Sequence, residues 1–208
     1  MLDRSLRAAL SGPLDAVAAA LDRPFLTPDR LTVAGLVLGL ASAGAAAAQW
    51  WAAAVVLWLV SRVADGLDGA LARRRRARGR GNDSEAGGFL DIAADFVVYG
   101  AGVFGVAWGA SAAYGAPWWP FLLVLLTYYV NGTAFLAFSS IAERTGRQVD
   151  DGRSLSFLGR IAEGTETIAV HTLWLILPFW AWQIALVWSL FVAVSAVQRI
   201  VAGYRLLR

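Results

Sequence analysis

Six long apolar segments, separated by short polar or charged stretches, follow one another from residue 31 to the end of the chain. Each is long enough to cross the hydrocarbon core of a bilayer, which takes about 20 apolar residues in a helix. The sequence therefore predicts an all-α integral membrane protein with six transmembrane helices, over residues 31–48, 50–73, 88–108, 118–141, 155–177 and 179–207.

The first 24 residues have a different pattern. Apolar residues at helical spacing form one stripe, and charged residues lie off it, so the stripe is too narrow for a membrane span. We expect an amphipathic juxtamembrane helix over residues 1–24, lying on the membrane surface or packed under the bundle of residues 31–207. The whole chain, 1–208, is then a single membrane domain.

Composition agrees with this interpretation. Of 208 residues, 58% are hydrophobic and 16% are charged, and the mean hydropathy of +0.57 is unlike that of an ordinary soluble domain. The chain has no cysteine, which excludes disulfides and thiolate chemistry. A pI of about 9.8 is also typical of proteins that bind nucleic acid. Here the basic residues flank the apolar segments, so we expect no nucleic-acid partner.

The distribution of charge also predicts orientation. Residues 49–51, 109–117 and 178–182 carry no charge, whereas the arginines lie before the first span, at the other ends of the spans, or in the loops that join those ends. By the positive-inside rule both termini face the cytoplasm, in a multi-pass protein of the inner membrane. The same rule accounts for the basic loop 74–86, which is also able to attract anionic headgroups of membrane lipids.

Four aspartates interrupt the second and third apolar segments. Asp65 and Asp68 are three residues apart and Asp91 and Asp95 are four apart, so each pair shares one face of its helix. Carboxylates on neighbouring apolar helices repel one another unless a cation lies between them. All-oxygen ligands suit a hard divalent ion such as Mg²⁺, Mn²⁺ or Ca²⁺. We expect a metal site here, because helix caps do not occur as same-face pairs inside apolar segments.

The residues around these aspartates form a longer motif. Asp-x-x-Asp-Gly-x-x-Ala-Arg begins at Asp65, and Gly-x-x-x-Asp-x-x-x-Asp begins at Gly87. This pattern resembles the signature of the CDP-alcohol phosphotransferases, membrane enzymes that move a phospho-alcohol from a cytidine diphosphate carrier to an acceptor hydroxyl. The gap between Arg73 and Gly87 is longer than the family pattern usually has. The surplus falls in a polar loop, where insertions are tolerated.

The resemblance implies a function in phospholipid biosynthesis. The donor is expected to be a CDP-alcohol such as CDP-diacylglycerol, and CMP is released when an acceptor alcohol attacks. Two divalent ions, Mg²⁺ or Mn²⁺ with Ca²⁺ able to occupy the site, would bind Asp65, Asp68 and Asp91, with Asp95 shared as a ligand or acting as general base. The resemblance also implies a homodimer. The CDP group is expected to lie near Asp68 and the small or basic residues Gly66, Gly69, Ala72 and Arg73.

Charged residues also occur outside this motif. Arg62 shares a face with Asp65 and either pairs with an aspartate or substrate phosphate or holds the helices in register. Family members with phosphorylated acceptors are similar in placing basic residues at the inner ends of the last spans. The acceptor candidates are Arg153, Arg160 and Arg199. The family uses several acceptor alcohols, and no motif here selects one.

The fifth apolar segment contains Glu163, Glu166 and His171. A lone histidine in a span is more often a hydrogen-bonding partner between helices than a ligand. The two glutamates share a face, and we expect them to support arginines or shape the acceptor pocket.

Two other function classes fit parts of the pattern. A membrane transporter or proton relay also uses intramembrane carboxylates, but it does not need the glycine, alanine and arginine of the motif at fixed offsets. An intramembrane prenyltransferase uses two aspartate-rich motifs with Mg²⁺, in a longer chain with different aspartate spacing. The phosphotransferase hypothesis accounts for more of the residues.

Overall fold

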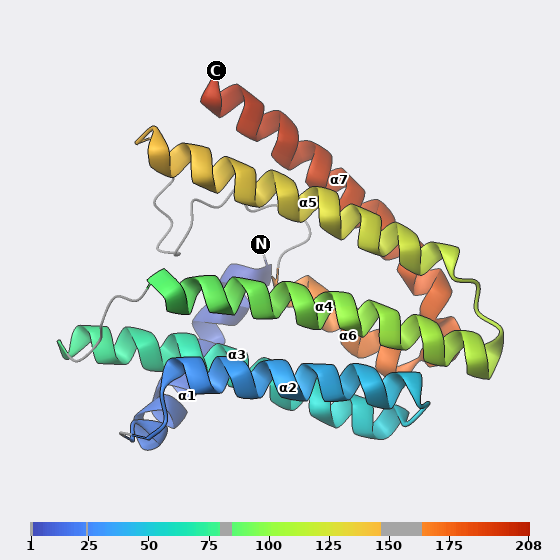
Figure 1. Ribbon diagram of the computed structural model, residues 1–208, viewed down its shortest axis with the longest axis horizontal. Coiled ribbons are helices and arrows are strands. Elements are labelled where there is room, and N and C mark those ends of the chain that lie inside the picture. Colours follow the sequence, from blue (N-terminus) through green and yellow to red (C-terminus); the bar gives the residue numbers. More distant parts are fainter. Residues whose placement is uncertain (1, 24, 80–84, 147–163) are drawn as a thin grey trace.

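The computed structural model describes residues 2–23, 25–79, 85–146 and 164–208, and every regular element in these ranges is helical. Figure 1 shows the arrangement. The elements are α1 (Leu2–Leu21), α2 (Pro28–Ala47), α3 (Trp51–Ala77), α4 (Glu85–Tyr114), α5 (Trp119–Arg144), α6 (Gly164–Ile176), the 3₁₀ turn η1 (Pro178–Trp180) and α7 (Ala181–Leu207).

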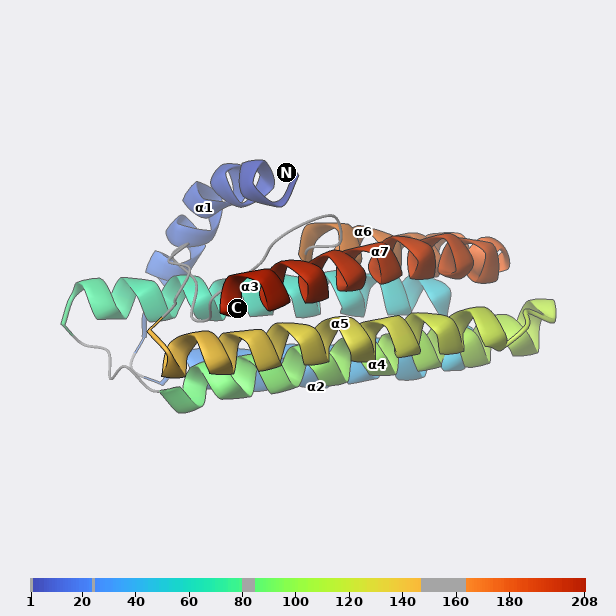
Figure 2. The same cartoon turned by 90° about the horizontal axis from the view of Figure 1, so that it is seen from above.

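The long helices run side by side, and α1 is set across them (Figures 1 and 2). Helix α2 packs mainly against α3 and α4, α5 packs mainly against α7, and α6 contacts α3. The C-terminal ends of α3, α5 and α7 and the N-terminal ends of α2 and α4 gather toward one end of the bundle (Figure 1). The motif aspartates lie on α3 and α4, the two helices that pack against α2.

Glycines let α2 and α4 approach each other closely. A Cβ atom added at Gly105 would lie 2.3 Å from the carbonyl oxygen of Ala43, and one at Gly109 would lie 2.0 Å from that of Ala46. Neither distance is possible for a real side chain. Such small-residue contacts are how helices pack in a membrane, where no hydrophobic force draws them together.

Four stretches of helix are long and apolar enough to cross a membrane, which supports the prediction of a membrane protein: Pro28–Ala47, Glu85–Tyr114, Trp119–Arg144 and Pro178–Leu207. Helix α3 lacks a sufficiently apolar stretch because the motif aspartates and a run of arginines occupy its C-terminal half. Helix α6 has only 13 described residues. The six-span arrangement therefore stays a prediction, as does the membrane-surface position of α1.

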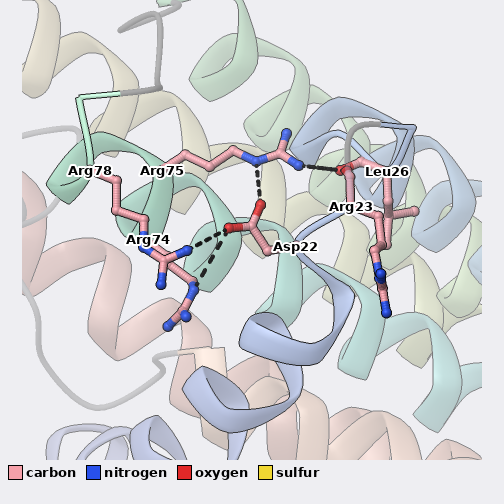
Figure 3. A network of polar contacts seen from close by, with 6 residues as sticks. All are labelled: Asp22, Arg23, Leu26, Arg74, Arg75 and Arg78. Atoms are coloured by element: carbon pink, nitrogen blue, oxygen red, sulfur yellow. Dashed lines mark hydrogen bonds and ion pairs between the residues drawn. The ribbon is translucent and has the colours of Figure 1, made fainter.

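A polar network fixes the segment between α1 and α2 to the C-terminal end of α3 (Figure 3). Arg75 donates from Nε to Oδ1 of Asp22 at 3.0 Å, and from Nη2 to the carbonyl oxygens of Arg23 and Leu26 at 2.9 and 2.8 Å. Arg78 adds a contact of 3.2 Å to Asp22. The hydrogen bond from Arg75 lowers the pKa of the Asp22 carboxyl, so this group stays ionised in the folded protein.

Candidate active site

Helices α3 and α4 bring the four motif aspartates, here called the aspartate quartet (Asp65, Asp68, Asp91 and Asp95), into one region. Asp65 interacts electrostatically with the other three members, and Asp68 interacts with both aspartates of α4. Each helix contributes a same-face pair, as the spacing predicts. The structure thus brings together residues that lie 23 or more positions apart between the two pairs.

Arg62 links the two helices inside this region. Its Nη1 atom lies 2.7 Å from Oδ1 of Asp95 on α4 and 3.5 Å from Oδ1 of Asp65, one turn along α3. The arginine side chain is 6% exposed, whereas those of Asp65 and Asp95 are 30% and 36% exposed. The guanidinium is therefore on the buried side of the two carboxylates, which remain accessible from the other side.

Two aromatic rings hold this guanidinium. Its central carbon lies 5.1 Å from the ring centroid of Trp58 and 5.2 Å from that of Tyr99, within cation–π distance of both. The sequence analysis missed these two residues. Their spacing carries a signal, because Trp58 precedes Arg62 by one helical turn and Tyr99 follows Asp95 by one turn.

A third residue missed by sequence reasoning is Thr32 on α2. Its hydroxyl lies 2.5 Å from Oδ2 of Asp68 and 3.2 Å from the carbonyl oxygen of Pro28. Both Thr32 and Asp68 are buried. A buried carboxylate needs hydrogen bonds to its oxygens, and α2 supplies one here.

The donors present match a hard divalent cation in kind. They are carboxylate oxygens, the described ranges contain no competing thiolate, and two of the carboxylates already share a positive partner in Arg62. Within those ranges, however, no three acidic or histidine side chains converge closely enough to form a ready-made metal cage. The Arg62 guanidinium contacts both Asp65 and Asp95, so a positive charge already lies beside these two carboxylates. The quartet therefore fits a divalent ion in chemistry, and the guanidinium is part of the same site.

The motif glycines have different neighbours. A Cβ atom at Gly87 would lie 3.3 Å from Oδ1 of Asp29, so Gly87 lets the start of α4 approach the start of α2. At Gly69 the nearest group is the Arg73 guanidinium, 3.2 Å from such an atom, so Arg73 lies back over this glycine. Gly66 instead lies beside a leucine of α1. The role of Gly66, Gly69, Ala72 and Arg73 in CDP binding stays a prediction.

The predicted acceptor residues are only partly described. Arg153, Arg160 and Glu163 lie outside the described residues. Arg199 of α7 is buried, and its Nη1 atom lies 3.4 Å from the carbonyl oxygen of Asn131 on α5. Its guanidinium also lies over a phenylalanine ring of α5, at 5.5 Å. Arg199 therefore joins α5 to α7, and its part in acceptor binding stays a prediction.

His171 of α6 makes contacts between helices, as the sequence analysis expected. Its Nε2 atom lies 3.1 Å from the hydroxyl of Tyr128 on α5, and this hydroxyl accepts a hydrogen bond of 2.7 Å from Trp188 on α7. The imidazole also stacks on Trp58, with 5.0 Å between the ring centroids. The histidine is thus part of the packing behind Arg62. Glu166, on the same helix, has a buried carboxylate oxygen with no hydrogen-bond partner in the described part of the chain.

Comparisons with known proteins identify the family of this chain. The family model for CDP-alcohol phosphatidyltransferase matches residues 25–197. The chain is 35% identical over 214 residues to the inner membrane protein YnjF of Escherichia coli (strain K12), covering 100% of this chain and 98% of that protein.

Two crystal structures of the phosphatidylinositol phosphate synthase PgsA1 of Mycobacterium tuberculosis have a similar fold. The one with CDP-DAG bound gives a TM-score of 0.64 at 24% identity, covering 93% of this chain and 92% of that chain. The complex with manganese and citrate gives 0.62 at 25% identity, covering 93% and 88%. With the family model spanning the quartet and most of the bundle, the chain belongs to the CDP-alcohol phosphatidyltransferase family of membrane phosphotransferases.

Proposed function

We propose that this protein transfers a phosphatidyl group from CDP-diacylglycerol to the hydroxyl of an acceptor alcohol and releases CMP. The observation that carries the proposal is the aspartate quartet, which lies on α3 and α4, two helices that both pack against α2. Asp65 and Asp95 are partly exposed, and the Arg62 guanidinium lies on their buried side. CDP-diacylglycerol is the donor that best fits this proposal, because a similar fold binds CDP-DAG in PgsA1.

We infer that Asp65, Asp68 and Asp91 hold divalent ions, Mg²⁺ or Mn²⁺, with Asp95 as a shared ligand. The support is the all-oxygen donor set and the manganese complex of PgsA1. Two ions are expected from the family resemblance, and Ca²⁺ is able to occupy the same oxygens. When bound, such ions neutralise the diphosphate and stabilise charge on the attacking and leaving oxygens.

Asp95 is the proposed general base. Its side chain is 36% exposed, so an acceptor hydroxyl is able to reach the carboxylate. Asp95 takes the hydroxyl proton as the acceptor oxygen forms a bond to the lipid-bearing phosphorus. The bond from that phosphorus to the bridging oxygen breaks, and CMP leaves with this oxygen. Arg62 keeps Asp95 oriented by a charge-assisted hydrogen bond of 2.7 Å.

The quartet is proposed to face the cytoplasm. The charge-free segments and the arginine-rich ends of the helices support this orientation, and the gathering of these ends at one end of the bundle agrees with it (Figure 1). The proposal includes membrane lipids as surroundings and a homodimer as the assembly, both expected from the family resemblance.

The experiment that tests the function uses the purified protein in detergent, CDP-diacylglycerol labelled in its lipid part, and a panel of acceptor alcohols. We expect one acceptor to become labelled with release of an equal amount of CMP, and only when Mg²⁺ or Mn²⁺ is present. A membrane transporter or proton relay would leave the labelled donor intact with every acceptor. Such a result would reject the phosphotransferase proposal.

A further inference from the structure

Arg62 is held in place by groups that do not belong to the aspartate quartet. Its Nη2 atom donates to Oγ of Ser61 at 3.0 Å, and Ser61 in turn donates to the carbonyl oxygen of Gly35 on α2 at 2.7 Å. The rings of Trp58 and Tyr99 lie at 5.1 and 5.2 Å from the guanidinium carbon. The position of this charge is therefore fixed by three helices, even apart from the carboxylates it contacts.

The guanidinium contacts the quartet unevenly. It forms a short contact with Asp95 and a longer one with Asp65, at 2.7 and 3.5 Å. No contact within ion-pair distance joins it to Asp68, whose Oδ2 atom is hydrogen-bonded to Thr32 instead. Positive charge is thus concentrated on the Asp95 side of the site.

A fixed cation changes how such a site binds ions. A divalent ion next to Asp95 is repelled by Arg62 at short range, and it also competes for a carboxylate oxygen that already accepts a charge-assisted hydrogen bond. An ion held by Asp68 and Asp91 meets less of this repulsion. Because the guanidinium is 6% exposed, bulk water screens it weakly.

We propose that Arg62 is a fixed positive charge within the site formed by the aspartate quartet. Arg62 positions Asp95 and weakens the binding of a divalent ion next to Asp95, so the two ions bind with unequal affinity. This inference rests on the proposed function, because it presupposes that the quartet binds divalent ions. It assigns Arg62 a positioning role toward Asp95.

The test is a titration of metal-free protein in detergent with Mn²⁺, in which the electron paramagnetic resonance signal of free Mn²⁺ gives the bound fraction. We expect the wild type to bind one ion at least about tenfold more tightly than the second, the scale of one lost charge-assisted interaction. Arg62→Met removes the cation, so the second ion should bind more tightly and the ratio of the two affinities should fall. Arg144→Met, which removes an exposed arginine of α5, should leave both affinities unchanged.

Asp95→Asn gives an independent test if Arg62→Met does not fold. This isosteric variant should keep the tight ion and lose the weak one. Loss of the tight ion in Asp95→Asn, or the same two affinities in the wild type and Arg62→Met, would overturn the inference and leave the phosphotransferase proposal standing. Absence of Mn²⁺ binding in the wild type would instead contradict the metal site itself, and the inference with it.

Discussion

The hydroxyl of Thr32 on α2 lies 2.5 Å from Oδ2 of Asp68 on α3. This contact ties the first aspartate pair to a helix that carries no motif residue. It satisfies one oxygen of a buried carboxylate and limits the directions in which the other oxygen is able to point. The aspartate quartet thus depends on α2 as well as on the two helices that contain it.

Thr32→Val removes the hydroxyl and keeps the shape of the side chain. We expect Mn²⁺ and CDP-diacylglycerol affinity to fall by roughly 10- to 150-fold, the equivalent of one hydrogen bond to a charged group, because Asp68 loses its fixed orientation. Calorimetric titration of the variant measures this. Thr32→Ser keeps the hydroxyl and should restore most of the affinity. Unchanged affinity in Thr32→Val would show that the contact does not orient Asp68.

The close contact of α2 and α4 predicts a strong effect of side-chain volume. A side chain at Gly109 would meet the backbone oxygen of Ala46, so Gly109→Ala should force the helices apart and destabilise the protein by about 1–3 kcal/mol. Gly100, on the same helix, has no neighbour within 4 Å of the added Cβ atom. Gly100→Ala is therefore a matched control, and its thermal unfolding in detergent should be unchanged or slightly improved. Equal melting temperatures for the two variants would contradict the close contact between α2 and α4.

The network around Asp22 predicts a pH-dependent contribution to stability. Arg75 lowers the pKa of this carboxyl in the folded protein below its ordinary value of 3.8. A lowered pKa gives stability that is fully present above the unfolded value and is lost as the pH falls through the folded one. Asp22→Asn should therefore melt at a lower temperature than the wild type at pH 7, and this difference should shrink below about pH 4.

Asp15→Asn is the control for Asp22→Asn, because Asp15 is an exposed carboxylate on α1 outside this network. It should melt like the wild type across the same pH range. A difference between Asp22→Asn and the wild type that is independent of pH would mean that the charge of Asp22 does not contribute.

Orientation is testable directly because the chain has no cysteine. Single cysteines at Ala77, at the end of α3, and at Ala113, in the last turn of α4, are both placed at exposed positions. With the quartet facing the cytoplasm, an impermeant thiol reagent added to intact cells with a permeable outer membrane should label Ala113→Cys only. Ala77→Cys should react after the inner membrane is opened. Labelling of both from the outside would contradict the proposed topology.

Much of this protein follows from local pattern. Hydropathy predicts helices close to their observed ends, as with residues 118–141 against Trp119–Arg144 for α5. The spacing of the aspartates predicts their common faces and, through the motif, the family. Helix α3 is harder to identify as a membrane span from hydropathy, because the motif aspartates and the arginines interrupt its apolar stretch.

The remaining features depend on contacts between distant residues. Thr32 and Asp68 are 36 positions apart, and Arg75 and Asp22 are 53 apart. No periodicity in one segment contains such a pairing. The contacts of Arg62 are predictable in part. Its spacing to Asp65 predicts a shared face, but its contact with Asp95 depends on how α3 and α4 are placed against α2.

The measurement that tests the account most directly compares transfer with binding in Asp95→Asn. With the acceptor that the panel identifies, the account predicts that phosphatidyl transfer falls by about 10²- to 10⁴-fold, the range for loss of a general base. The affinity for CDP-diacylglycerol should stay close to that of the wild type, because Asp65, Asp68 and Asp91 still hold an ion. Transfer at the wild-type rate in Asp95→Asn, or transfer that persists in excess chelator, would contradict the account.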